Sequence, residues 1–302
     1  MGRDLAEQFP IAREGFDRAN AALGYDLAAL CFDGPESELT KTEHAQPGIY
    51  LVGWVAFRLL LEQVPFLQFE AVAGLSLGEF TALAAAGALD FEDGLRLVRA
   101  RGRFMQEACE ATRGAMAAVI GLEEQPTREV CQQAGVQLAN LNCPGQLVIS
   151  GEADRVGRAG ELALQAGAKR VLPLPVAGAY HSPLMQTAAP RLQAELERVQ
   201  VRAPSVMVLA NVTGEPHGDP ASIRRRLVEQ VTVPVLWQRG IQRLLADGFT
   251  RFIELGPGKA LSGFMRRIDR QAEVLNVGDA ASLGDTVRAL EGARLDAPLK
   301  PA

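Results

Sequence analysis

A serine flanked by glycines is the residue in this chain best suited to covalent chemistry. Residues 71–80 read Ala-Val-Ala-Gly-Leu-Ser-Leu-Gly-Glu-Phe, an apolar run that breaks at Gly-x-Ser-x-Gly and continues into a helix-favouring stretch. Strand, tight turn and helix in this order are typical of a nucleophile elbow, which projects Ser76 at a helix N-terminus. We expect glycine to be required at 74 and 78, because the turn leaves no room for flanking Cβ atoms. We also expect the amide of Leu77 to face an oxyanion.

A serine nucleophile needs a base, and the chain offers three histidines. His44 and His217 lie in polar, turn-rich segments, where an exposed side chain is the ordinary outcome. His181 instead follows an apolar strand and a small-residue turn, at a predicted junction between two domains, and such junctions bind ligands. We therefore expect His181 to be the general base. Since no acidic residue stands near it in sequence, we expect a Ser–His dyad whose imidazole is oriented by a backbone carbonyl or amide.

Arg101 lies on the apolar side of a predicted helix over 95–108. At about 100° per residue, Arg96, Arg99 and Arg103 cluster on one face of this helix, and Arg101 falls opposite them among apolar side chains. A guanidinium aimed at the interior needs an anion there, because an unpaired buried charge is costly. The anion is either a carboxylate of the protein or a substrate carboxylate held bidentately, and the helix alone does not decide between them.

Composition excludes several other classes of protein. The 302 residues are 48% hydrophobic and 22% charged with a net charge of −5, which gives no electrostatic footprint for nucleic acid. No apolar run approaches the roughly 18 residues of a membrane span, and the N-terminus has no signal-peptide core, so we expect a cytoplasmic protein. The four cysteines are scattered, which argues against a disulfide framework and a zinc site. We expect no metal and no bound cofactor.

Around these residues the pattern predicts two domains. The middle of the chain has the order β-α-β-β-α-β of a ferredoxin-like unit, and we assign it to a small domain over 114–176. This domain is inserted into a larger α/β domain made of 1–113 and 177–302. The strands of the small domain are predicted over 116–122, 136–141, 146–150 and 170–176, and its helices over 126–134 and 153–166. In the larger domain we predict helices over 47–63, 183–200 and 220–230, and strands over 206–210 and 251–254.

The chain resembles the malonyl-CoA:acyl carrier protein transacylases and the acyltransferase domains of polyketide synthases. The resemblance covers nearly the whole chain, and its motifs occur in order. They are Ala45-Gln-Pro, Gly74-Leu-Ser-Leu-Gly-Glu-Phe, Arg101-Gly-Arg-Phe-Met-Gln-Glu-Ala, Gly114-Ala-Met-Ala-Ala, Asn142-Cys-Pro-Gly-Gln-Leu-Val-Ile-Ser-Gly, Gly178-Ala-Tyr-His-Ser-Pro-Leu-Met and Glu254-Leu-Gly-Pro-Gly-Lys. The resemblance implies an α/β-hydrolase-like large domain with the ferredoxin-like (βαββαβ) small domain inserted.

The resemblance also implies a reaction, which is ping-pong transfer of a malonyl group from malonyl-CoA to the phosphopantetheine thiol of acyl carrier protein in fatty-acid biosynthesis. It implies a monomer with these two partners. The implied site has Ser76 as the acylated nucleophile, His181 as its base, Arg101 on the malonyl carboxylate, the Gln230 carbonyl orienting the histidine, and Gln46 and Asn140 near the acyl pocket.

Two departures from the family keep alternatives open. Family members begin with a strand leading into Phe-Pro-Gly-Gln-Gly, whose glutamine amide is the second oxyanion donor; this chain starts just past that segment, so we expect an incomplete N-terminus. Leu75 stands where the family usually has histidine. Some acyltransferase-like proteins that hydrolyse acyl groups from carrier proteins look like this at the elbow, and so do some transacylases. The alternatives are therefore such a hydrolase, a trans-acting polyketide acyltransferase, or an impaired non-enzymatic homologue. Arg101 favours malonyl transfer, because neutral acyl chains need no buried cation.

Overall fold

The N-terminal part of the molecule is a group of helices packed around one long helix. The computed structural model describes residues 1–295, with side chains to residue 292. Helix α5 (Thr42–Gln63) is buried along most of its length and packs on α7 (Phe91–Glu110), as an apolar helix must. It begins five residues before the predicted start and holds Pro47 inside. The other helices of the group are α1 (Arg3–Gln8), α2 (Pro10–Leu23), α3 (Leu27–Asp33), α4 (Glu36–Leu39) and α6 (Gly78–Ala85).

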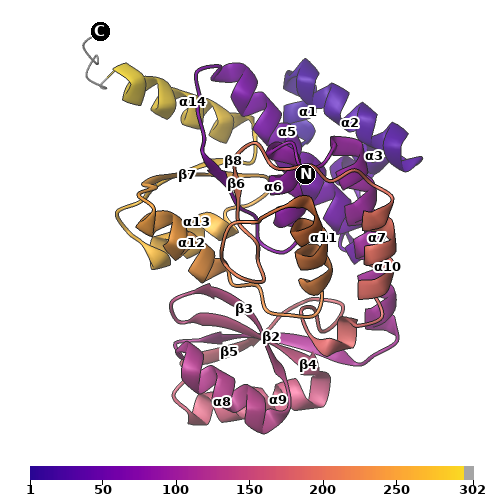
Figure 1. The fold of residues 1–302 in the computed structure, drawn as a ribbon, viewed down its shortest axis with the longest axis vertical. Coiled ribbons are helices and arrows are strands. Elements are labelled where there is room, and N and C mark those ends of the chain that lie inside the picture. Colours follow the sequence, from indigo (N-terminus) through magenta and orange to yellow (C-terminus); the bar gives the residue numbers. More distant parts are fainter. Residues whose placement is uncertain (296–302) are drawn as a thin grey trace.

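Two short parallel pairs of strands lie beside these helices (Figure 1). Strand β1 (Ala71–Val72) pairs with β6 (Met207–Val208), and β7 (Arg251–Leu255) pairs with β8 (Glu273–Val277). The strand predicted over 206–210 is thus only two residues long. The other elements of this part are α10 (Ala189–Glu197), α11 (Pro220–Glu229), α12 (Trp237–Ala246), α13 (Ala260–Ile268) and α14 (Ala280–Leu295).

The single helix predicted over 183–200 is wrong. The chain forms a short 3₁₀ helix, η1 (Pro183–Met185), and then starts α10 anew. Both begin with a proline in their first two positions, where a fixed φ and a missing N–H are tolerated. The break between these two helices therefore lies a few residues after His181.

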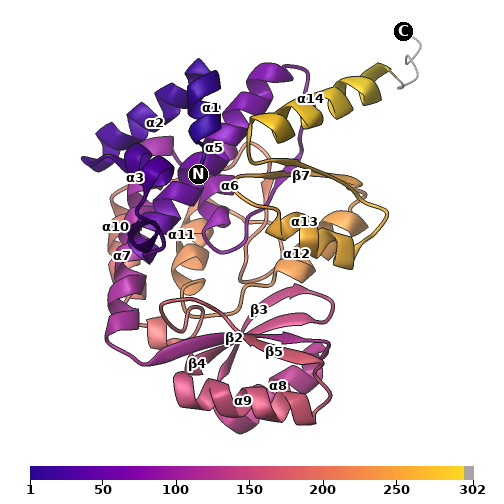
Figure 2. The same cartoon turned by 180° about the vertical axis from the view of Figure 1, so that it is seen from behind.

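The middle of the chain forms a small antiparallel sheet in the order β3-β4-β2-β5, with a helix after β2 and another after β4 (Figure 2). The βαββαβ order is the one that the sequence predicts. Helices α8 and α9 cover one face and share an apolar core with it, and the other face is turned toward the rest of the molecule. The strands are β2 (Gly114–Ile120), β3 (Gln137–Cys143), β4 (Gln146–Glu152) and β5 (Arg170–Pro173), and the helices are α8 (Glu124–Ala134) and α9 (Ala153–Gln165).

The fold is therefore mixed α/β, with the small antiparallel sheet set against a larger part that carries the elbow. Within residues 1–295, no helix combines the length and the apolar character needed to cross a membrane. The four cysteines are buried free thiols, and burial raises the pKa of Cys31, Cys109 and Cys131 to about 11.

Candidate active site

Ser76 stands on a sharp turn between β1 and α6, and its backbone is left-handed with φ of 53°. A Cβ atom added at Gly74 would lie 1.9 Å from the carbonyl carbon of Gly78, so only glycine fits at 74. A Cβ atom at Gly78 would meet nothing within 4 Å. The expectation that both glycines are required is therefore wrong for position 78, because only at Gly74 would an added Cβ atom collide with the backbone.

Ser76 and His181 form a hydrogen-bonded pair. The Ser76 Oγ lies 2.9 Å from His181 Nε2, and His181 Nδ1 lies 2.8 Å from the carbonyl oxygen of Gln230. A carbonyl oxygen only accepts, so Nδ1 carries the proton and Nε2 is free to accept from the serine hydroxyl. His181 is 4% exposed; burial, and then the positive charge of Arg101, lower its pKa to about 4, against the opposing effect of the Gln230 carbonyl. The imidazole is therefore neutral at pH 7 and can take a proton.

The same two residues carry backbone strain. Among the described residues, Ser76 and His181 are the only non-glycine residues with left-handed φ angles, at 53° and 56°. Each such conformation costs on the order of 1 kcal/mol and persists only where the surroundings enforce it. The turn at His181 is enforced by Ser182, whose hydroxyl donates to Ala179 O at 2.7 Å and accepts from Leu184 N. Both strained positions thus coincide with the proposed reacting groups.

Arg101 is buried beside the nucleophile, with 1% of its surface exposed. Its guanidinium donates to Ser76 Oγ at 3.0 Å, Gln46 Oε1 at 2.8 Å and Gln230 Oε1 at 2.9 Å. All three acceptors are neutral, and no salt bridge to Arg101 occurs within the described residues. Burial lowers its pKa to about 10, which leaves it charged at pH 7. The explanation of Arg101 as a direct ion pair inside the protein is therefore wrong, and the guanidinium reaches the serine with only neutral protein groups as hydrogen-bond partners.

The remaining predicted residues differ in their positions. The N–H of Leu77 takes part in no hydrogen bond within residues 1–295, so it is free to donate beside Ser76. Gln46 contacts Arg101 directly, as does the side chain of Gln230. Asn140 lies on β3, where its backbone bridges to Val235, and no side-chain hydrogen bond within the described chain joins it to the serine cluster. The structure brings Ser76, His181, Arg101, Gln46 and Gln230 together and leaves Asn140 outside their contacts.

Sequence reasoning missed a buried polar group behind the serine. His217 was expected to be exposed, but its side chain is fully buried and bonded to Glu79. Glu79 and Asn211 are buried as well: the Asn211 side chain contacts the elbow backbone at Gly74 and Ser76, and Glu79 accepts from the backbone N–H of Asn211. Position 79 lies in the motif Gly-x-Ser-x-Gly-Glu, three residues after the serine, which is the one signal that could have marked it.

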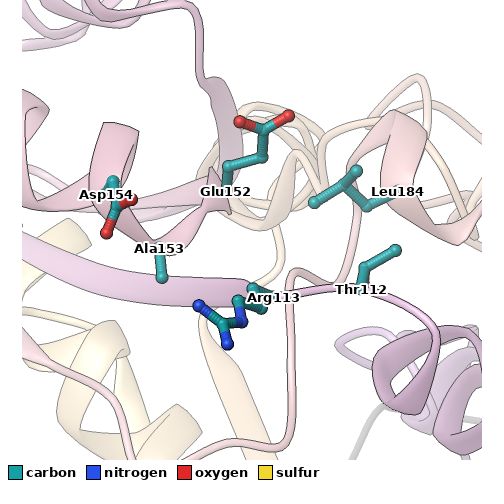
Figure 3. Close-up of a pocket in the computed structure, with 6 residues that line it drawn as sticks. All are labelled: Thr112, Arg113, Glu152, Ala153, Asp154 and Leu184. Atoms are coloured by element: carbon teal, nitrogen blue, oxygen red, sulfur yellow. The ribbon is translucent and has the colours of Figure 1, made fainter.

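A cavity of about 340 Å³ lies elsewhere, where the end of α7 meets the end of β4 and η1 (Figure 3). Neither Ser76 nor His181 lines it, so it is separate from the dyad. Its lining is Thr112, Arg113, Glu152, Ala153, Asp154 and Leu184. Within residues 1–295, no group of three His, Cys, Asp or Glu side chains is placed to hold a metal ion.

Comparisons with known proteins identify the family of this chain. The family model of the acyl transferase domain matches residues 1–298. Malonyl CoA-acyl carrier protein transacylase of Bacillus subtilis is 41% identical over 96% of this chain and 93% of its own length. The chain belongs to the malonyl-CoA:acyl carrier protein transacylase family. The polyketide biosynthesis malonyl CoA-acyl carrier protein transacylase PksC of Bacillus subtilis is 37% identical over 91% of this chain and 94% of its own length. The crystal structure of an acyl carrier protein S-malonyltransferase from Vibrio cholerae superposes with a TM-score of 0.91 at 41% identity, covering 95% of this chain and 94% of the other.

Proposed function

We propose that this protein transfers a malonyl group from malonyl-CoA to the phosphopantetheine thiol of acyl carrier protein in fatty-acid biosynthesis. The observation that carries the proposal is the cationic Arg101 guanidinium, 3.0 Å from a serine hydroxyl that is itself hydrogen-bonded to a neutral imidazole. A serine and a base alone would serve any acyl group. A buried cation at the nucleophile selects an acyl group with a free carboxylate.

In the first half-reaction, Ser76 gives its proton to His181 Nε2 as its oxygen attacks the thioester carbonyl carbon. The Leu77 amide donates to the oxyanion that forms. The carbon–sulfur bond then breaks, and the sulfur of coenzyme A takes the proton from Nε2. The Gln230 carbonyl holds the imidazole in the tautomer that this exchange needs, and it stabilises the imidazolium while it exists.

In the second half-reaction, the thiol of the carrier protein gives its proton to His181 Nε2 and its sulfur attacks the malonyl-serine ester. The carbon–oxygen bond breaks and the Ser76 oxygen takes the proton back, which restores the resting enzyme. Arg101 holds the malonyl carboxylate through both steps, with Gln46 and Gln230 as the neutral acceptors that keep the guanidinium in place.

The arrangement of the chain fits a catalytic domain of the α/β-hydrolase-like kind, made of residues 1–113 and 177–302, with a ferredoxin-like domain over 114–176. The elbow and α7 come from the first segment and His181 from the second, just after the small sheet ends at β5. Asn140 lies on the strand of the small sheet that bridges to Val235 in the larger part. We therefore place the acyl pocket between the two parts, with Asn140 on its wall.

The test is incubation of the protein with malonyl-CoA and holo acyl carrier protein, with all species measured by intact mass. Malonylated enzyme and malonylated carrier are the expected products, and Ser76→Ala should abolish both. Rapid formation of free malonate without loaded carrier would instead establish a hydrolase.

Arg101→Ala should lower kcat/KM for malonyl transfer by about 100-fold more than for acetyl transfer, since charged hydrogen bonds are worth about 1.5 to 3 kcal/mol each. An equal loss on both substrates would refute the carboxylate role.

A further inference from the structure

Behind the serine lies a buried acid that the proposed mechanism does not use. Glu79 is 0% exposed and sits in the first turn of α6, three residues after Ser76. Its Oε1 lies 2.7 Å from His217 Nε2, and its Oε2 accepts from Asn211 N at 3.0 Å and Gln230 Nε2 at 2.7 Å. Three donors, two from the loop that holds Asn211 and His217 and one from Gln230 at the end of α11, thus converge on the two carboxylate oxygens.

These contacts fix which way the Gln230 side-chain amide points. Its Nε2 faces oxygen acceptors of Glu79, Ser76 and Asn211, at 2.7, 3.0 and 3.4 Å. Its Oε1 is thereby left to accept from Arg101 at 2.9 Å. A flipped amide would turn an NH₂ group toward the guanidinium and an oxygen toward the carboxylate, and both contacts would be repulsive. Glu79 is the one charged acceptor among the three and makes the shortest of these hydrogen bonds, so it contributes most to this orientation of Gln230.

The same carboxylate fixes the elbow through Asn211. The Asn211 side chain accepts from Ser76 N at 2.5 Å and donates to Gly74 O at 2.7 Å, so it bridges the two sides of the strained turn. Its backbone N–H is the group bonded to Glu79. The left-handed backbone of Ser76 is thus tied through Asn211 to Glu79.

We propose that Glu79, held in place by His217, is a positioning residue of the acyl-transfer reaction: it aims Arg101 through Gln230 and fixes the Ser76 turn through Asn211. This inference rests on the proposed function for its choice of substrate, and on geometry alone for its effect on the serine. The negative charge of Glu79 also raises the pKa of Arg101, against the lowering by burial, and so favours the charged guanidinium. It does so without a direct ion pair. A direct ion pair would occupy the guanidinium, whereas this arrangement leaves it available for a substrate carboxylate.

Glu79→Gln removes the charge while keeping the shape. An amide has one oxygen for three donors, and its own NH₂ must face at least one of them. His217 can relieve this conflict by presenting an unprotonated Nε2 to that NH₂, but the negative charge that faces Gln230 Nε2 and favours the cationic Arg101 is lost in either case. The substitution therefore disturbs the group that we assign to the malonyl carboxylate more than the dyad itself. A loss of selectivity for malonyl over acetyl groups is expected, and general loosening of the fold would not produce it.

Glu254→Gln is a matched control. Glu254 likewise accepts three hydrogen bonds with its carboxylate, from Leu261 N at 2.9 Å, Ser262 N at 2.8 Å and Ser262 Oγ at 2.5 Å, but it caps α13 and none of its hydrogen bonds within the described residues reaches the serine network. It should destabilise the protein in a comparable way without altering the rate per folded active site.

The experiment measures single-turnover acylation of Ser76 by malonyl-CoA and acetyl-CoA, together with urea unfolding of each variant. For Glu79→Gln we expect malonyl acylation to fall about 10- to 100-fold per folded enzyme, and the malonyl-to-acetyl ratio to fall with it. Glu254→Gln should keep the wild-type ratio. An unchanged ratio in Glu79→Gln, or the same change in both variants, would overturn the proposal.

Two substitutions at His217 keep the proposal testable if Glu79→Gln does not fold. His217→Gln retains an N–H donor for Glu79 and should keep most of the activity, whereas His217→Leu removes the donor and should reproduce the loss of selectivity. Equal behaviour of the two variants would contradict a role through Glu79. Inactivation by phenylmethanesulfonyl fluoride reads the reactivity of Ser76 without any acyl-CoA. A wild type that reacts with this reagent but transfers no malonyl group would refute the proposed function. The effect of Glu79 on Ser76 would then be tested by comparing the rates at which the wild type and the Glu79 and His217 variants react with the reagent.

Discussion

The acid limb of the pH profile is the sharpest test of the dyad. Burial and the charge of Arg101 lower the pKa of His181 to about 4, from an ordinary value of about 6.5. The imidazole must be neutral to accept the Ser76 proton. The reactivity of the serine should therefore persist in acid, where an ordinary histidine would already be protonated.

The size of the effect follows from the two pKa values. At pH 5.5, a base with a pKa of 4 is about 97% neutral, whereas one with a pKa of 6.5 is about 9% neutral. The structure therefore predicts that serine reactivity at pH 5.5 is nearly the same as its plateau at neutral pH, whereas an unperturbed dyad would keep only about a tenth of its plateau rate. The difference of about 2.5 pKa units corresponds to about 3 kcal/mol of preference for the neutral imidazole.

Phenylmethanesulfonyl fluoride is a suitable probe, because it is uncharged and, unlike malonyl-CoA, has no ionisable group whose own titration would enter the pH profile. The rate of Ser76 sulfonylation is measured in short pulses from pH 3.5 to 8, with circular dichroism at each pH to confirm that the protein is folded. In Arg101→Met the midpoint should rise, since one of the two causes of the shift is removed, but it should stay below 6.5 because burial remains. A wild-type midpoint near 6.5, or a midpoint that Arg101→Met leaves unchanged, would refute the reasoning.

Three further predictions concern the elbow, the core and the pH dependence of stability. Gly74→Ala should abolish acylation while Gly78→Ala keeps it, because only the first places a Cβ atom against backbone, at 1.9 Å; mass labelling with malonyl-CoA checks both. Leu59→Ala, at a fully buried position of α5, should lower the free energy of unfolding by about 2 to 5 kcal/mol in urea titrations. Since the pKa of His181 is lower in the folded protein, the unfolded chain binds the extra proton, so stability should fall as pH falls from about 6.5 to about 4; His181→Ala should flatten this dependence.

Local patterns predicted much of the fold, and the failures have physical causes. The small sheet follows from alternating and apolar segments of ordinary length, so its strands and helices could be located. Pro47 hid the first turn of α5, because a proline is usually read as a helix start and here lies inside the helix. Residues 183–200 have helical composition, but Pro190 starts a separate helix, α10, within this range. The first error arises where the packing of α5 overrides a local rule, whereas the second lies at a proline that itself marks a helix start.

The candidate site was predictable to the extent that single residues carry their own signals. Ser76 has a turn motif and Arg101 has an unusual place on its helix, so both could be found from the sequence. His217 could not, because its polar segment is typical of the surface and only the fold brings it to Glu79. The difference between Gly74 and Gly78 was also hidden, since the motif treats them alike and the direction of each Cβ atom does not appear in the sequence.

The acyl group affects how easily His181 takes up a proton, because the positive charge of Arg101 acts on the imidazole. Arg101 opposes protonation of His181, so its positive charge makes formation of the imidazolium less favourable. In the proposed mechanism, a malonyl carboxylate on Arg101 would offset that positive charge and make the imidazolium easier to form at the moment when Ser76 gives up its proton. An acetyl group offers no such compensation. In the proposed mechanism, selectivity for malonyl groups would therefore act on the acylation step as well as on binding. The acceptors Gln46 and Gln230 would matter because they are neutral: a protein carboxylate in their place would supply the compensation with every substrate.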